Sequence, residues 1–147
     1  MICVDASVAV KWILNEERSD RARALYQAAL RAGESIVAPT LLPLEVTNIL
    51  RQRMRANNGL SLTEAVRQLG DFLDFRIELH NPVGLHFEAL VLADALDLAA
   101  TCDAHYLALA EHLGCELWTD DQRLIRRVAI GLPYVHWIGD HPARVGE

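Results

Sequence analysis

The chain has little of what several protein classes require. Its 147 residues contain only three cysteines, without the spacing of a zinc site, and an odd number of thiols does not support a disulfide framework. We therefore expect Cys3, Cys102 and Cys115 to be small buried thiols in a reducing cytoplasm. No segment approaches the roughly 20 apolar residues of a membrane span, and no basic region typical of a signal peptide opens the sequence. We expect a cytoplasmic protein without a membrane segment.

Positive charge is also scarce. Lys11 is the only lysine, and 14 basic residues against 20 acidic ones give a net charge of −6. This balance argues against a protein that coats DNA by electrostatic attraction alone. It does not exclude a nuclease, because metal ions can supply the positive charge at a phosphate.

Apolar strand-like segments alternate with helix-like segments along the chain. The predicted strands are 2–4, 35–39, 75–80, 115–119 and 133–138. The predicted helices are 8–14 with Ser7 as its cap, 19–34, 40–59, a helix opened by a Ser61–Glu64 capping box, 86–100, a helix opened by Asp103, and 121–129. This alternation predicts a parallel sheet covered on both faces, so the fold class is α/β. We expect a three-layer α/β/α sandwich of about five strands, in one domain over residues 1–147.

Four carboxylates lie at the edges of apolar segments: Asp5, Glu45, Asp103 and Asp121. In an open α/β fold, ligands bind outside the carboxyl ends of the strands, and Asp5 and Asp121 follow predicted strands. Each residue also has a simpler explanation. Asp5 could be a turn residue or helix cap, Glu45 part of a solvated helix face, Asp103 a helix N-cap, and Asp121 a turn residue.

Carboxylates that crowd together repel, and each raises the pKa of its neighbours unless a cation neutralises them. Mg²⁺ or Mn²⁺ prefers such oxygen ligands and can activate a water for in-line phosphodiester hydrolysis. The four acids therefore predict a shared metal pocket. The six histidines are scattered, and none is placed convincingly as a ligand or as an acid or base.

Three segments resemble the motifs of a PIN-domain ribonuclease, and within that family a VapC-type toxin of a bacterial toxin–antitoxin pair. VDASVAVKWILNEE carries Asp5 and the hydroxyl of Ser7, and APTLLPLEVTNIL carries Glu45 and Asn48. CDAHYLALAEHLGCELWTDDQRL carries Asp103, Thr119 and Asp121. The T-x-D pattern of the family selects Asp121, although its neighbour Asp120 is also acidic.

The resemblance implies a five-stranded parallel sandwich and a Mg²⁺- or Mn²⁺-dependent endoribonuclease that cuts structured RNA. It further implies a type II toxin that forms a homodimer and is inhibited by a cognate VapB-type antitoxin. Asp5 and Asp103 are the expected direct metal ligands. Glu45 and Asp121 complete the catalytic pocket, supported by Ser7, Asn48, Thr119 and Asp120. A PIN-like interaction module without catalysis and a DNA-directed metal nuclease remain alternatives.

Several basic residues lie on predicted helices that begin beside these acids. Lys11, Arg51, Arg53 and Arg55 could line a path for RNA, and we assign RNA binding to Arg51 and Arg55, which share a helix face. An ordinary solvated surface explains them equally well. Trp12, Trp118 and Trp137 stand in apolar contexts and are expected in the core.

Overall fold

The computed structural model describes residues 1–128 and 131–144, and in them five parallel strands form one sheet of order β3-β2-β1-β4-β5. The strands are β1 (Ile2–Val4), β2 (Ile36–Pro39), β3 (Ile77–His80), β4 (Glu116–Thr119) and β5 (Val135–Trp137). The helices are α1 (Ala6–Ala9), η1 (Val10–Trp12), α2 (Ser19–Ala32), α3 (Leu42–Arg55), α4 (Leu62–Leu73), α5 (Leu85–Ala95), α6 (Cys102–Leu113), α7 (Gln122–Val128) and η2 (Ile138–Asp140).

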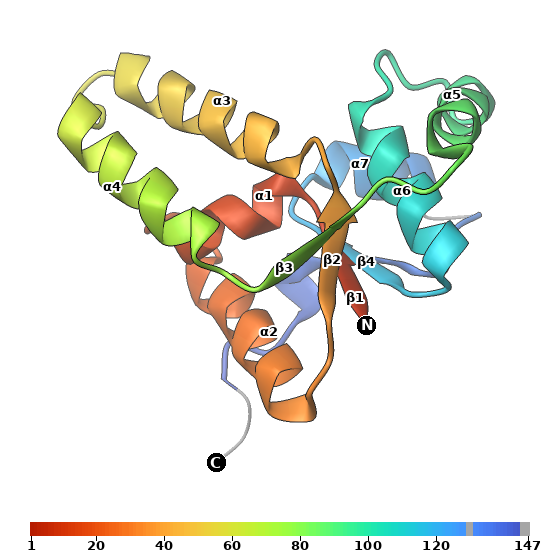
Figure 1. The fold of residues 1–147 in the computed structure, drawn as a ribbon, viewed down its shortest axis with the longest axis horizontal. Coiled ribbons are helices and arrows are strands. Elements are labelled where there is room, and N and C mark those ends of the chain that lie inside the picture. The colour runs from red at the N-terminus through yellow and green to blue at the C-terminus, as the bar shows by residue number, and fades with distance from the viewer. Residues whose placement is uncertain (129–130, 145–147) are drawn as a thin grey trace.

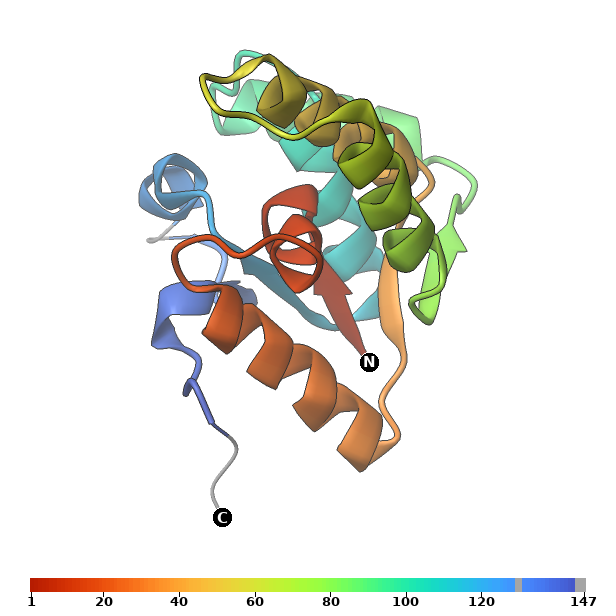
Figure 2. The ribbon, with the colours of Figure 1, turned by 90° about the vertical axis from the view of Figure 1, so that its left-hand side faces the viewer.

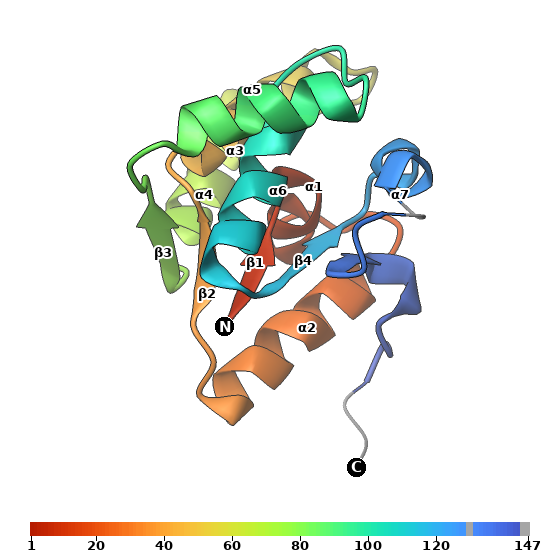
Figure 3. The same cartoon turned by 90° about the vertical axis from the view of Figure 1, so that its right-hand side faces the viewer.

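Helices cover both faces of this sheet, so the predicted three-layer α/β/α sandwich is confirmed. α1 and α2 lie on one face, towards the viewer in Figure 2, and α6 lies on the other, towards the viewer in Figure 3. β1 occupies the centre, pairs with β2 and β4, and is buried along its whole length. Its three apolar residues are buried on both faces, as expected for a central parallel strand.

The α3–α4 pair projects away from the sheet, at the edge where the strands end (Figure 1). α3 leaves this edge directly after β2 and buries Leu42, Val46 and Leu50 along one stripe. The predicted capping box opens α4, with Ser61 and Glu64 each bonding the other's backbone N–H at 3.1 Å. The pair therefore forms an arm beside the carboxyl ends of β1 and β2.

Several sequence-based boundaries and burial assignments were wrong. The helix predicted over 86–100 ends at Ala95, because Asp97 takes a positive φ and the chain turns there. Only Cys3 of the three cysteines is buried, whereas Cys115 is half-buried and Cys102 is exposed at the start of α6. Trp12 lies in the core, but Trp118 and Trp137 are only half-buried. Ala129, at the end of a predicted helix, lies outside the described residues.

Substitution of two glycines is expected to change stability in opposite directions. A Cβ on Gly59 would overlap the carbonyl oxygen of Arg53 and lie 2.7 Å from that of Ala56. Gly70 lies inside the exposed part of α4, with nothing within 4 Å of an added Cβ. We expect Gly59→Ala to lower the free energy of unfolding by about 1–3 kcal/mol. We expect Gly70→Ala to raise it by about 0.5–1 kcal/mol, because alanine is the better helix former.

Urea unfolding of both variants beside the parent protein measures these changes. If both substitutions changed the free energy of unfolding in the same direction, the packing described around Gly59 would be contradicted.

Candidate active site

Asp5 forms the centre of the site because its carboxylate is buried where β1 ends. Its Oδ1 accepts hydrogen bonds from Ser7 Oγ at 2.6 Å and from the backbone N–H of Val8 at 3.2 Å. Its Oδ2 accepts a hydrogen bond from the hydroxyl of Thr119, at the end of β4. Asp5 is therefore the N-cap of α1, and the prediction that Ser7 caps this helix was wrong. Ser7 lies inside α1 and directs its hydroxyl at Asp5.

The two hydroxyls also hold the turn that follows β4. Ser7 Oγ accepts the backbone N–H of Asp120 at 2.8 Å, and Thr119 Oγ1 accepts that of Asp121 at 3.0 Å. Since each hydroxyl has one proton, accepting these N–H groups leaves both protons directed at Asp5. The end of β1 and the turn after β4 are therefore joined through one carboxylate.

Glu45 and Asp103 approach this edge from α3 and α6. Glu45 lies in the first turn of α3, and its Oε1 accepts a hydrogen bond from the buried Tyr106 hydroxyl at 2.6 Å. Asp103 lies in the first turn of α6, whose N-cap is Thr101, so the prediction of Asp103 as N-cap was wrong. The helix begins earlier than predicted and places Asp103 one turn before Tyr106. Spacing from Asp103 is the signal by which the sequence could have indicated Tyr106.

The negative charges of these residues act on one another. Burial raises the pKa of Asp5 to about 7, against the opposing effect of the hydrogen bonds from Ser7 and Thr119, and the charge of Asp103 adds to the rise. Burial also raises the pKa of Asp103, and the charges of Asp121 and Glu45 add to it. The structure thus brings all four predicted carboxylates into one electrostatic neighbourhood.

Asp120 and Asp121 are adjacent in sequence but bond to different partners. Asp121 Oδ1 accepts the backbone N–H groups of Arg123 at 2.9 Å and Leu124 at 3.3 Å, so it caps α7. Asp120 instead forms ion pairs, through Oδ1 with Arg18 Nε at 2.6 Å and through Oδ2 with Lys11 Nζ at 3.1 Å. Although burial opposes it, these cations hold the pKa of Asp120 below its ordinary value.

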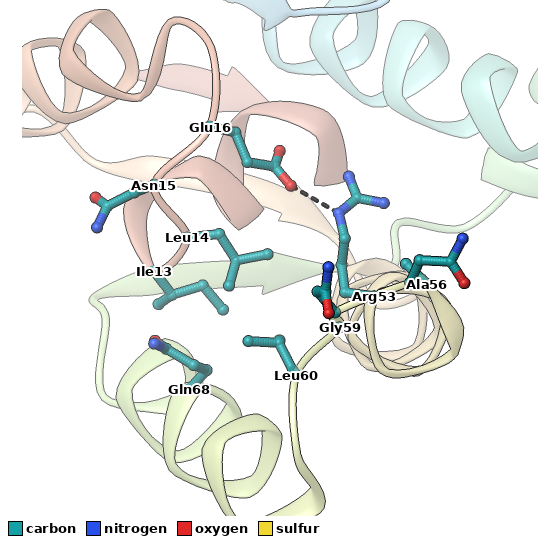
Figure 4. A pocket seen from close by; sticks show the side chains of 11 residues that line it. Ile13, Leu14, Asn15, Glu16, Arg53, Ala56, Gly59, Leu60 and Gln68 are labelled. Carbon is teal, nitrogen blue, oxygen red and sulfur yellow. Dashed lines mark hydrogen bonds and ion pairs between the residues drawn. The ribbon is translucent and has the colours of Figure 1, made fainter.

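The other predicted residues are more peripheral. Asn48 is exposed one turn after Glu45, and Arg51 and Arg55 are exposed further along α3. Lys11 is buried against Asp120, so it does not line an open RNA path, whereas Arg53 donates to Glu16 at 2.7 Å with its side chain still partly exposed. A pocket of about 380 Å³ opens beside the Glu16–Arg53 ion pair (Figure 4), and the four carboxylates do not line it.

The donor set suits a hard divalent cation. The charged side chains that act on Asp103 are Asp121 and Glu45, both negative, so the site has an excess of negative charge. In residues 1–128 and 131–144, no three His, Cys, Asp or Glu side chains already stand close enough together to hold an ion. The chemistry of the residues fits Mg²⁺ or Mn²⁺, which Asp5, Glu45, Asp103 and Asp121 would hold.

Comparison with known proteins agrees with this geometry. The model of the PIN domain family matches residues 2–131. The chain belongs to the PIN domain family. Ribonuclease VapC9 of Mycobacterium tuberculosis and a VapC ribonuclease of Mycobacterium bovis are each 36% identical to this PIN domain over 124 residues, covering 84% of this chain and 88% of the relative. The resemblance to VapC-type proteins is therefore confirmed.

Solved structures share the fold of this PIN domain. PAE2754 from Pyrobaculum aerophilum has a TM-score of 0.66 at 24% identity and covers 94% of this chain and 90% of its own. VapBC2 from Rickettsia felis, bound to a DNA fragment from its promoter, has a TM-score of 0.66 at 15% identity, covering 93% and 97%. VapC20 of Mycobacterium tuberculosis, a sarcin–ricin loop cleaving toxin, has a TM-score of 0.64 at 18% identity, covering 92% and 98%.

The raised pKa of Asp5 makes stability depend on pH. The folded protein holds the Asp5 proton up to about pH 7, whereas the unfolded chain releases it near the ordinary value of 3.8. Asp5 therefore contributes stability that is fully present below about pH 4 and is lost as the pH rises through 7. We expect the free energy of unfolding of Asp5→Asn to exceed that of the parent by roughly 1–3 kcal/mol at pH 7–8 in EDTA, so that it unfolds at a higher temperature. This advantage should shrink towards pH 4.

Thermal melts across this pH range measure the difference. Asp71→Asn, on the exposed surface of α4, is the matched control and should follow the parent. An Asp5→Asn protein less stable than the parent at pH 8 would show that Asp5 acts chiefly as a helix cap.

Proposed function

We propose that this PIN domain is a metal-dependent endoribonuclease and the toxin of a type II toxin–antitoxin pair. The observation that carries the proposal is the set of four carboxylates from separate segments whose charges act on one another at one sheet edge. Relatives at 36% identity that are named as VapC ribonucleases support the reaction. A structural neighbour that cleaves the sarcin–ricin loop supports a structured RNA as the substrate class.

In this proposal Asp5 and Asp103 hold the cation directly. The pKa values of both acids are raised, by burial and by neighbouring negative charge, so a bound cation would relieve an electrostatic cost there. Glu45 and Asp121 complete the pocket directly or through water. When bound, Mg²⁺ or Mn²⁺ supplies a Lewis acid that neutralises phosphate oxygens and activates water for in-line attack.

The neighbours of these acids hold them in place for the cation. The hydroxyls of Ser7 and Thr119 fix both oxygens of Asp5. Burial raises the pKa of Tyr106, and Glu45 adds to the rise, so the phenol keeps its proton and donates a hydrogen bond to Glu45. One Glu45 oxygen is thereby held in place. Such preorganisation keeps ligand geometry fixed during hydrolysis.

The same proposal includes a homodimer and a VapB-type antitoxin. The Rickettsia felis structure pairs its VapC2 with VapB2, which supports an antitoxin of the same kind here. Large apolar side chains are exposed on α5, where Phe87 is 79% and Val91 68% exposed. Others are exposed on the α3–α4 arm, where Leu44 is 73% and Leu62 66% exposed. Exposed apolar side chains of this size suit protein partners. In the part of the chain that the structure describes, no helix could span a membrane.

Purified protein incubated with total cellular RNA tests the reaction. We expect cleavage with Mg²⁺ or Mn²⁺ and none in EDTA, and a loss of at least about 100-fold in Asp5→Asn and Asp103→Asn. Sequencing of the cut ends identifies the target RNA. The exposed Asp71→Asn variant should cleave like the parent.

Two results would overturn the assignment. Cleavage of RNA in EDTA would remove the metal from the mechanism. Cleavage of single- or double-stranded DNA in preference to RNA would favour the DNA-directed nuclease instead.

Arg51 and Arg55 are proposed to bind the RNA backbone. α3 begins beside the site, and at a rise of about 1.5 Å per residue Arg51 lies about 9 Å and Arg55 about 15 Å beyond Glu45 along the axis. We expect Arg51→Ala and Arg55→Ala to raise KM and to reduce the dependence of binding on salt by about one counterion each. The cut position and kcat should stay the same.

Cleavage kinetics at several NaCl concentrations measure both effects. Arg31→Ala is the control, because Arg31 is exposed in the last turn of α2, at the opposite edge of the sheet. If all three variants share the salt dependence of the parent, the RNA path does not follow α3.

A further inference from the structure

A cluster of ion pairs centred on Asp120 adjoins the acidic site. Asp120 accepts hydrogen bonds from Arg18 Nε at 2.6 Å and Arg18 Nη2 at 3.1 Å, and lies 3.1 Å from Lys11 Nζ. Trp137 Nε1 donates to the same carboxylate at 3.2 Å. The side chains of Lys11 and Asp120 are only 7% and 10% exposed. The only lysine of the chain is therefore committed to this cluster.

The cluster also reaches the helix that carries Glu45. Lys11 Nζ lies 3.5 Å from Glu16 Oε2, and Glu16 Oε1 accepts from Arg53 Nε at 2.7 Å. Figure 4 shows this last ion pair between the loop after η1 and α3. Lys11 thus connects the turn after β4 with α3 through two carboxylates.

A short path of hydrogen bonds joins the cluster to Asp5. The backbone N–H of Asp120 donates to Ser7 Oγ, and Ser7 Oγ donates to Asp5 Oδ1. The next residue, Asp121, donates through its own N–H to Thr119 Oγ1, which bonds the other oxygen of Asp5. Fixing the Asp120 side chain therefore fixes both N–H groups that orient the hydroxyls on Asp5.

Stability alone is a poor explanation for such a cluster. Removing charged groups from water costs about as much as their attraction returns, and apolar residues often replace buried ion pairs without loss. What an apolar replacement could not provide is a fixed direction for the turn and a fixed position for two cations.

We propose that Asp120, with Lys11 and Arg18, is a positioning residue that holds the turn after β4 and thereby the two N–H groups that orient Ser7 and Thr119 on Asp5. The proposal rests on the proposed function, because it assigns Asp120 a role in the same pocket. Asp120 touches neither the cation nor the RNA. It acts through Ser7, Thr119 and the backbone of Asp121.

Asp120→Asn tests this role, because it keeps the shape of the side chain and removes its charge. We expect the Kd for Mn²⁺, measured by electron paramagnetic resonance on the RNA-free protein, to rise about 10- to 100-fold. Hydrogen exchange of the Asp120 and Asp121 amides should accelerate, and RNA cleavage should need correspondingly more Mn²⁺. Asp97→Asn is the matched control, since it removes a 97% exposed carboxylate 3.5 Å from Arg127. It should change none of these quantities.

Arg18 provides a second test that does not require Asp120→Asn to fold. The Arg18 side chain is partly exposed, and lysine and methionine keep its unbranched shape, so we expect both variants to fold. Arg18→Lys keeps the positive charge and Arg18→Met removes it. We expect Mn²⁺ affinity to fall in the order parent, Arg18→Lys, Arg18→Met.

A lower melting temperature with unchanged Mn²⁺ affinity and unchanged amide exchange would overturn the proposal and leave Asp120 a purely structural role. A parent protein that binds Mn²⁺ but cuts no RNA would contradict the proposed function alone, since the Mn²⁺ and exchange measurements still test the positioning role. A parent that binds no Mn²⁺ would contradict both.

Discussion

The burial of the Asp5 carboxylate is the constraint on which the rest of the site depends. A charge in the interior is costly unless hydrogen bonds or a cation compensate it, and here two hydroxyls and one backbone N–H do so in part. Because these donors come from α1 and from the end of β4, neutralising one carboxylate also ties two segments together. The turn after β4, and with it Asp121, takes its position from this arrangement.

Charge is divided between two neighbouring groups of residues. Asp120 and Glu16 form ion pairs with cations, namely Lys11, Arg18 and Arg53. Although burial acts in the opposite direction, these cations hold the pKa values of both acids below their ordinary values. Asp5 and Asp103 show the opposite shift, because burial and negative neighbours act on them. In the proposed function, a protein of net charge −6 needs positive charge at the RNA phosphate, and this division would leave much of that task to a divalent cation.

Much of the fold could be predicted because hydrophobic pattern and local chain signals agree. The buried strand before Asp5, the Ser61–Glu64 box and the glycine that ends α2 are each encoded within a few residues. The errors fall where tertiary contacts outweigh local preference. Ser7 has the chemistry of a helix cap, but the buried carboxylate of Asp5 takes that place and Ser7 donates to it instead.

The sequence by itself determined the α/β order of elements, the parallel sheet and the set of four carboxylates, because apolar periodicity and residue type are local properties. Only the tertiary structure decided how Asp120 and Asp121 differ, since two adjacent acids are indistinguishable until Lys11 and Arg18 meet one of them across the fold. The same holds for Tyr106 and Glu45, which are 61 residues apart and meet through a single hydrogen bond. Such partners depend on how separate elements pack, and no local pattern records that.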